Sequence, residues 1–378
     1  MKEQHLPGIT HRNLLQRALN ELELPGKVVG VHVGASVSRF EVEIAPGVRI
    51  SDFEKAAPEI AERLSVPAVR VALPIPWDQR LGIEIPNEHR REVGLCEVLA
   101  AAARRCGKLK LPVVLGTDVK NKPVVFDLAA APQVLVAGAD ENEKDACLDT
   151  MIAGLICRFG PDELKFIMID SQHGSLEKYG ALPHLLPPIN VGSVDAPATL
   201  RWIANEIDRR YRTCLRYRVK TLHELLRLSP ETKEADKGSK RLPYLVVVVA
   251  ELAELMESKD KRKIESELCR IAMKGRAAGI HLVVGASQFL QRSITGIIKA
   301  CLPTRICFKA DSDADSRQVL DRRDAALLTG SGDLLLDPID GTGPIRAQCA
   351  TVPDPAKRHL ARNIDLKNPA LPDTNAVR

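Results

Sequence analysis

The stretch around residue 138 sets the strongest limit on the fold, because a loop that begins with glycine joins an apolar run to a helical pattern there. Residues 134–137 are all apolar, as in a strand buried on both faces, and residues 146–157 repeat apolar side chains at helical spacing. This is the context of a phosphate-binding P-loop, whose pattern is G-x-x-x-x-G-K-[ST]. The loop in this chain contains Gly138-Ala139-Asp140-Glu141-Asn142-Glu143-Lys144-Asp145.

The loop keeps the first glycine and the lysine of that pattern, but two other positions differ. Glu143 stands where the second glycine is expected, and Asp145 replaces the serine or threonine whose hydroxyl holds Mg²⁺. Four carboxylates against one ammonium give the loop a charge of −3. Two like charges about 5 Å apart repel by roughly 3 kcal/mol at an effective dielectric constant of about 20, so we expect the loop to repel a triphosphate.

The acidic loop also has interpretations that involve no nucleotide. Acidic side chains at a helix N-terminus interact well with the helix dipole, so they could take the place of a phosphate in a purely structural loop. Asp140 and Asn142 begin the calcium pattern D-x-[DN]-x-[DN]-G, but Lys144 and Asp145 break it. We therefore expect no metal site here.

A second motif lies at the end of the apolar run 246–249. In P-loop ATPases such a strand ends in Asp-Glu, where the aspartate supports Mg²⁺ and the glutamate orients the attacking water. Here Ala250 takes the aspartate position, and Glu251 is kept. Because alanine cannot hold a hydrated metal ion, we expect hydrolysis to be absent or very slow. The alternative is an ordinary buried strand with a polar residue after it.

The order of patterns along the chain predicts two kinds of domain. From about residue 131 apolar runs alternate with helical patterns, which indicates an α/β fold with a mainly parallel sheet. Shorter strands and helices before that point predict a small α+β domain. We therefore predict an α+β domain over residues 1–130, an α/β domain over 131–352 and an irregular tail over 353–378.

The composition limits which cellular compartments and binding partners are plausible for the chain. No apolar stretch approaches the ~20 residues that a transmembrane helix needs, so we expect a cytoplasmic chain without membrane contact. The nine cysteines include no C-x-x-C pair, so we expect small buried side chains in a reducing compartment, with neither disulfides nor metal ligands. The net charge of +5 is compatible with nucleic-acid binding but does not demonstrate it.

Matching segments in matching order give the chain a resemblance to a known family. Residues 134–352 resemble the motor domain of the FtsK/SpoIIIE DNA translocases, and residues 38–128 resemble the smaller domain that precedes that motor. The matching segments include Leu200-Arg201-Trp202, Arg276-Ala277-Ala278-Gly279-Ile280, Pro303-Thr304-Arg305-Ile306 and Asp315-Ser316-Arg317.

The resemblance implies a RecA-like P-loop NTPase core, a homo- or hetero-oligomeric ring around double-stranded DNA, and ATP with Mg²⁺ as cofactors. It also implies DNA movement in chromosome segregation, without sequence preference. By position, residues 138–145 match the nucleotide loop, Glu251 the catalytic carboxylate and Gln288 a sensor residue. Arg305 or Arg317 would be the arginine that reaches into a neighbouring subunit's site.

Two functions follow from these observations. The acidic loop favours a subunit that has lost ATP binding and hydrolysis, or retains them only weakly. The alternative is an active ATP-dependent translocase with an atypical site. Two basic groups could contact DNA phosphates, although Asp260 and Glu265 make the first group more typical of a solvated helix face. These groups are Lys259, Lys261, Arg262 and Lys263, and then Lys274 with Arg276.

Overall fold

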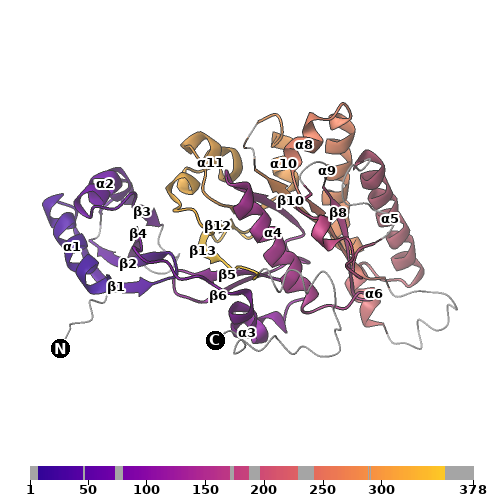
Figure 1. The fold of residues 1–378 in the computed structure, drawn as a ribbon, viewed down its shortest axis with the longest axis horizontal. Coiled ribbons are helices and arrows are strands. Elements are labelled where there is room, and N and C mark those ends of the chain that lie inside the picture. The colour runs from indigo at the N-terminus through magenta and orange to yellow at the C-terminus, as the bar shows by residue number, and fades with distance from the viewer. Residues whose placement is uncertain are drawn as a thin grey trace.

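The computed structural model describes residues 7–45, 47–72, 80–170, 174–186, 196–228, 242–287, 289 and 291–353. In Figure 1 a small N-terminal unit lies at one end of a larger α/β unit. The strands of the described residues form two sheets, one of four strands and one of nine. No helix in these ranges is long and apolar enough to cross a membrane. All but the first residue of the tail predicted over 353–378 lies outside the described residues.

The small unit is an antiparallel sheet covered by two helices. Its strands follow the order β1 (Gly26–Val33), β2 (Val37–Ile44), β4 (Arg80–Pro86) and β3 (Arg70–Ala72), and the helices are α1 (Pro7–Glu21) and α2 (Ile50–Arg63). Alternation in β2 buries Phe40 and Val42. These side chains pack with Leu19, Phe53 and Ile60 from the helices, which forms the core of the unit.

The larger sheet has the order β6-β5-β13-β12-β11-β7-β10-β9-β8. The five strands from β11 to β8 are parallel, whereas β12, β13, β5 and β6 each pair antiparallel with their neighbours. The parallel strands are β7 (Gln133–Ala137), β8 (Leu164–Ile169), β9 (Tyr244–Val249), β10 (Ile280–Ala286) and β11 (Thr304–Cys307). The antiparallel ones are β5 (Pro112–Asp118), β6 (Pro123–Asp127), β12 (Asp333–Asp337) and β13 (Ile345–Cys349).

The prediction of a mainly parallel sheet was therefore wrong for nearly half of the strands. The connections from β5 to β6 and from β12 to β13 are short, and a parallel pairing would require a longer crossover. Strands β5 and β6 precede residue 130, yet they hydrogen-bond into the larger sheet through β13. A side chain at Gly116 would meet the Gln348 backbone oxygen at 1.9 Å, so this close approach between β5 and β13 requires glycine.

Helices cover both faces of the larger sheet. Helices α4 (Glu141–Ile156) and α6 (Leu222–Arg227) pack on the face that carries Val134 and Val136. The opposite face, with Leu135 and Ala137, packs against five helices. These are α5 (Ala196–Arg216), α8 (Leu252–Glu257), α9 (Lys261–Ala278), α10 (Gly296–Cys301) and α11 (Asp313–Leu320). Because both faces are buried, strands β7, β8, β9 and β10 are apolar at most positions, as the sequence indicated.

Helix α3 (Leu95–Cys106) packs beside the antiparallel half of the sheet. Its Val98 and Ala102 contact a cluster that contains Val114 of β5 and Val125 of β6. In Figure 1 this helix lies below β5 and β6. Helix α3 and strands β5 and β6 thus place residues 95–127 in contact with the larger unit.

A buried ion network joins the small unit to the larger one. Arg346 of β13 donates to Asp333 at 3.0 and 2.6 Å and to Glu84 of the small sheet at 3.0 Å. Arg70 donates to the same Glu84 at 2.9 Å and to Asp324, also at 2.9 Å. Arg346, Asp333 and Glu84 are almost completely buried. The two units are therefore connected by charges that have almost no access to water.

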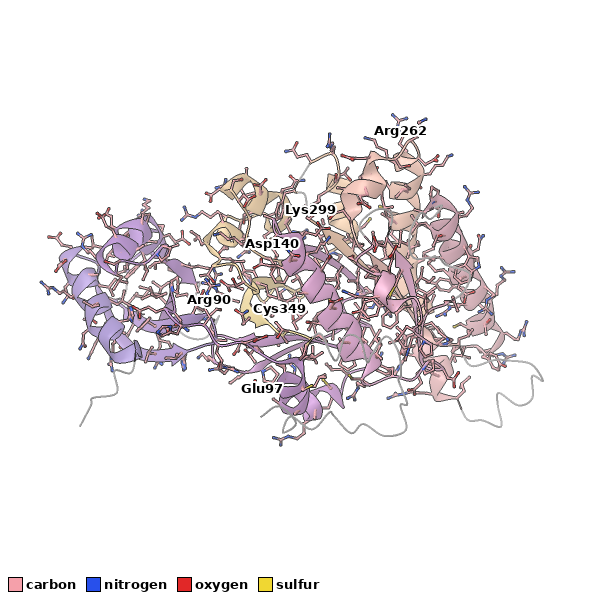
Figure 2. All side chains as sticks on the ribbon, in the orientation of Figure 1. Arg90, Glu97, Asp140, Arg262, Lys299 and Cys349 are labelled. Atoms are coloured by element: carbon pink, nitrogen blue, oxygen red, sulfur yellow. The ribbon has the colours of Figure 1, made fainter. Side chains whose placement is uncertain are left out.

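A second connection reaches the loop before β12. Arg90, which follows the small unit in the chain, donates from its two terminal nitrogens to the Gly330 and Thr329 backbone oxygens at 2.9 and 3.0 Å. Figure 2 shows Arg90 between the small unit and the strand that carries Cys349. The loop at residues 329–332 is thus fixed from the side of the small unit.

Candidate functional site

The predicted nucleotide loop lies where the carboxyl ends of the parallel strands meet, which is the usual binding edge of an open α/β sheet. The loop after β7 is held by two backbone hydrogen bonds. Gly138 N donates to Ala286 O of β10 at 3.2 Å, and Ala139 N donates to Lys309 O after β11 at 3.1 Å. Glu251 follows β9 at the same edge. The structure therefore brings together the two motifs that the sequence separated by about a hundred residues.

Asp140 caps helix α4. Its Oδ1 accepts hydrogen bonds from the Asn142 backbone N at 2.9 Å and from the Asn142 side chain at 3.0 Å. A P-loop uses the free N–H groups of this first turn to hold phosphate. Here the Asp140 carboxylate accepts from one N–H group of that turn, that of Asn142. In Figure 2 Asp140 lies at the upper end of α4, which is the N-terminal end of the helix.

Lys144, the one cation of the loop, is buried among carboxylates. Its side chain is 1% exposed, and its Nζ lies 3.2 Å from Glu251 Oε2, 3.3 Å from Asp145 Oδ1 and 3.7 Å from Glu141 Oε1. Burial works against the charge, but the neighbouring carboxylates of Asp145 and Glu251 outweigh it and raise the pKa of Lys144. The ammonium is therefore charged and already neutralised within the chain.

Glu251 is likewise held by several hydrogen bonds. Its Oε2 accepts from the Ser287 backbone N at 2.8 Å and from the Ser287 hydroxyl at 2.6 Å, in addition to the contact with Lys144. Its Oε1 accepts from Ala253 N at 3.0 Å and thereby caps α8. A side chain at Gly285 would meet the Ala250 backbone oxygen at 2.3 Å, so glycine permits the close packing beneath this pair.

Glu143, at the position of the second P-loop glycine, reaches toward the loop before β12. Its Oε1 accepts from Gly332 N at 2.9 Å, and its Oε2 has no hydrogen-bond partner among the described residues. Burial raises the pKa of Glu143, and the nearby charge of Asp140 raises it further. This carboxyl group connects the nucleotide loop to the loop at residues 329–332.

A cleft of about 300 Å³ opens beside the loop. Three carboxyl groups and one lysine contribute to its lining, which consists of Ala139, Asp140, Glu143, Lys309, Asp311, Thr329, Gly330 and Ser331. No group of three or more histidine, cysteine or acidic side chains in the described ranges could hold a metal ion. Lys144 does not line this cleft, and its ammonium contacts Glu251 at 3.2 Å.

The other predicted site residues lie apart from this cluster or cannot be placed. Gln288 lies outside the described residues. Arg305 of β11 pairs with Asp321 at 2.9 Å and is only 16% exposed. Arg317 of α11 is 58% exposed and lies 3.6 Å from Asp313. Of the two arginines, Arg317 is therefore the more exposed.

Sequence reasoning missed two contributors to the site. Ser287 holds Glu251, and the loop at residues 329–332 holds Glu143. A signal for the loop was present, since Gly330-Ser331-Gly332 between apolar runs is typical of a turn, and all three residues have positive φ. Ser287 offered no comparable signal, because a single serine after a strand is common.

The predicted DNA-contact residues lie at both ends of α9. Residues 258–263 form a groove of about 560 Å³, and Lys263 pairs with Asp260 at 2.8 Å. Arg262 is exposed and points away from the body of the protein in Figure 2. Lys274 and Arg276 are farther along the helix, and Lys274 is exposed there. Residues 258–263 contain four cations and one carboxylate, so the groove carries a positive charge.

The sheet order and the loop at its carboxyl edge define an α/β protein of the P-loop ATPase class. The sequence model of the FtsK/SpoIIIE family matches residues 94–292, and that of the FtsK alpha domain matches residues 4–87. The chain therefore belongs to the FtsK/SpoIIIE family.

Curated relatives agree along nearly the whole chain. The chain is 36% identical to DNA translocase SftA of Bacillus subtilis over 96% of its length, and it spans 37% of that relative. It is 36% identical to DNA translocase FtsK of Vibrio parahaemolyticus over 90% of its length and spans 35% of that protein. It is also 36% identical to DNA translocase FtsK of Haemophilus influenzae, of which it spans 68%.

Solved structures share the fold at lower identity. The pCW3 conjugation coupling protein TcpA, solved as a monomer with ATPγS, has a TM-score of 0.60 and 18% identity over 92% of this chain and 96% of that one. The cytoplasmic domain of the Type VII secretion ATPase EccC of Thermomonospora curvata has a TM-score of 0.56 and 21% identity. It matches 67% of this chain and 30% of its own. At these identities the likeness concerns the fold alone.

Proposed function

We propose that this chain is an FtsK-type DNA translocase subunit whose nucleotide loop is closed by its own charges, so that ATP binding and hydrolysis are lost or severely weakened. The observation that carries this proposal is the position of Lys144, buried and ion-paired with Glu251, Asp145 and Glu141. In a working P-loop the same lysine is free to reach the outer phosphates.

The energies involved support this closure. A triphosphate that recruited Lys144 would leave the buried carboxylate of Glu251 without its cation, and breaking a buried ion pair in this way costs about 3–5 kcal/mol. Micromolar binding corresponds to about 8 kcal/mol, so this one step would remove a large part of it. Repulsion from Asp140 and Glu143 beside the cleft adds to that cost.

We further propose double-stranded DNA as the partner, bound without sequence preference, and a homo- or hetero-oligomeric ring in chromosome segregation as the assembly. Support comes from the DNA translocases at 36% identity and from the exposed cations of α9. In a mixed ring the exposed Arg317 would be the residue that completes a neighbour's site, whereas Arg305 is held by Asp321.

Calorimetric titration with Mg-ATP tests the closed loop. The purified chain is expected to show no binding heat up to about millimolar nucleotide, because the loop's own lysine is not available to the phosphates. Near-ultraviolet circular dichroism and a cooperative thermal transition verify that the sample is folded. Heat that fits a micromolar dissociation constant would instead support the alternative, an active ATP-dependent translocase with an atypical site.

Salt-dependent duplex binding tests the DNA partner. We expect weak binding to a duplex of arbitrary sequence at low salt, with a logarithmic affinity that falls linearly with the logarithm of salt concentration. Substituting Lys261 and Arg262 with alanine is expected to reduce that slope by about 1 for each lost phosphate contact. Arg17→Ala, an exposed cation of the small unit, is the matched control and should leave the slope unchanged. A complete lack of duplex binding at low salt contradicts this partner.

A further inference from the structure

Two cysteines outside the nucleotide loop lie in direct contact. Cys269 is in α9 and Cys301 is the last residue of α10, and their Sγ atoms are 2.8 Å apart although 32 positions separate them in the chain. Both side chains are partly exposed. The structure has thus brought two thiols from different helices together at a place that solvent can reach.

The separation between the sulfurs decides which chemistry the pair suits. A tetrahedral zinc site with Zn–S bonds of about 2.3 Å keeps its sulfurs about 3.8 Å apart, which is wider than this pair. A disulfide needs about 2.05 Å, so the two sulfurs have to approach by less than about 1 Å. No third histidine, cysteine or acidic ligand joins them in the described part of the chain. The geometry is therefore close to that of a disulfide and far from that of a metal site.

We propose that Cys269 and Cys301 form a reversible intramolecular disulfide when the protein meets a peroxide. One thiol, as its thiolate, attacks the O–O bond of hydrogen peroxide, which gives a sulfenic acid and, after proton transfer, one water. The second thiol then attacks the sulfenic sulfur, forms the S–S bond and releases a second water. The two thiols lose two electrons and two protons, and the peroxide is reduced to two molecules of water.

The surrounding contacts hold the two helices in this position. The Thr295 hydroxyl, which caps α10, bonds Glu265 of α9, one helical turn before Cys269. At the other end of α10, Lys299 bonds Asp321 at 2.7 Å. Because these contacts fix α10 at both ends, the disulfide can form in the folded protein without displacing either helix. In Figure 2 Lys299 lies in the region between α11 and α9.

A comparison with a second pair in the chain shows why the exposure of Cys269 and Cys301 matters. Cys147 and Cys349 also meet, but both side chains are buried, so a peroxide cannot reach them. Burial, and then the neighbouring Cys301, raise the pKa of Cys269 to about 12. The accessible Cys269 therefore stays in the thiol form at neutral pH, and the pair reacts slowly, only when an oxidant is supplied.

Non-reducing peptide mapping tests the proposal. The folded chain is exposed to hydrogen peroxide at neutral pH, excess peroxide is removed, free thiols are alkylated and the protein is digested with trypsin. Cleavage isolates Cys269 in residues 264–270 and Cys301 in residues 300–305, each as the one cysteine of its peptide. We expect these peptides as a linked pair, about 2 Da lighter than their sum, that dithiothreitol separates. Amide exchange of residues 296–301 is expected to slow at the same time.

Matched variants keep the test specific. Cys157→Ser removes an exposed cysteine elsewhere and should leave the linked pair unchanged, whereas Cys269→Ser should abolish it. Recovery of both peptides in alkylated form, or of either cysteine as sulfinic acid without a link, overturns the proposal. A link that appears only when oxidation is carried out in denaturant overturns it as well. None of these outcomes bears on nucleotide binding, since the nucleotide loop does not contain these thiols.

Discussion

Substituting Arg346 with alanine is expected to lower the free energy of unfolding by about 3–5 kcal/mol, because it leaves two buried carboxylates with too few cations. Asp333 loses both of its hydrogen bonds from the Arg346 guanidinium. Glu84 keeps the hydrogen bond from Arg70 but loses the one from Arg346. All of these groups are buried, so water cannot replace the missing charge. Denaturant titration, followed by far-ultraviolet circular dichroism and fluorescence, measures the loss.

Two control variants separate charge from general destabilisation. Arg346→Lys keeps a cation with fewer directed donors and should lie between the wild type and alanine. Arg17→Ala removes an exposed pair with Glu21 and should change stability by less than about 1 kcal/mol. If Arg346→Ala unfolds at the same denaturant concentration as Arg17→Ala, the buried network does not stabilise the connection between the two units.

The same network makes the free energy of unfolding depend on pH. Burial alone would raise the pKa of Glu84, but Arg70, Arg346 and Arg39 outweigh it and hold that pKa at about 2, below its ordinary 4.5. A carboxylate whose pKa is lower in the folded state stabilises the fold above pH 4.5, and that stabilisation is lost as pH falls toward 2. The Arg346→Ala variant should lose less stability than the wild type between pH 4.5 and 2, because one fewer cation then lowers the pKa of Glu84. Denaturant titrations of both proteins across this pH range measure the difference.

The sequence predicted the parallel half of the larger sheet well, because those strands are apolar on both faces and helices follow them. It failed where local patterns were short. Strand β6 is five residues long and begins at Pro123, and β13 has an exposed Ile345 and a half-buried Gln348. Neither gives a clear period, since their place in the sheet depends on neighbours far away in the chain. These two strands, and the antiparallel pairing around them, therefore required the tertiary structure.

For the candidate site, too, the sequence predicted some features and missed others. Residue types and spacing indicated that Lys144 and Glu251 share a site, because both follow strands of one sheet edge. The sequence did not indicate that they pair with each other, since that depends on the rotamer of a buried lysine. Glu143 was expected to repel phosphate, whereas in the structure it also holds Gly332 and so connects the nucleotide loop to the loop that Arg90 contacts. Such multiple roles follow from packing and leave no local signal.

Restoring the nucleotide loop is expected to recover Mg-ATP binding from undetectable to micromolar, a gain of at least about 100-fold. The variant carries Glu143→Gly, Asp145→Ser and Ala250→Asp, with Asp140 and Glu141 changed to asparagine and glutamine. Glycine at position 143 frees the backbone to approach phosphate. The hydroxyl introduced at position 145 and the carboxylate introduced at position 250 supply contacts to Mg²⁺. Removing the charges at 141 and 145 also leaves Lys144 with one carboxylate partner in place of three.

The decisive control adds Lys144→Ala to the restored loop. If the recovered binding depends on the lysine released from its carboxylates, this addition should abolish the calorimetric signal, whereas Lys309→Ala beside the cleft should weaken it less. Titration of the restored protein without Mg²⁺ should give weaker binding, because the new hydroxyl and carboxylate act through the metal. A restored loop that folds normally yet binds no nucleotide would show that charge and glycine content are not what closes this site. The obstruction would then lie in the contacts of Glu251 with Ser287, which these substitutions leave in place.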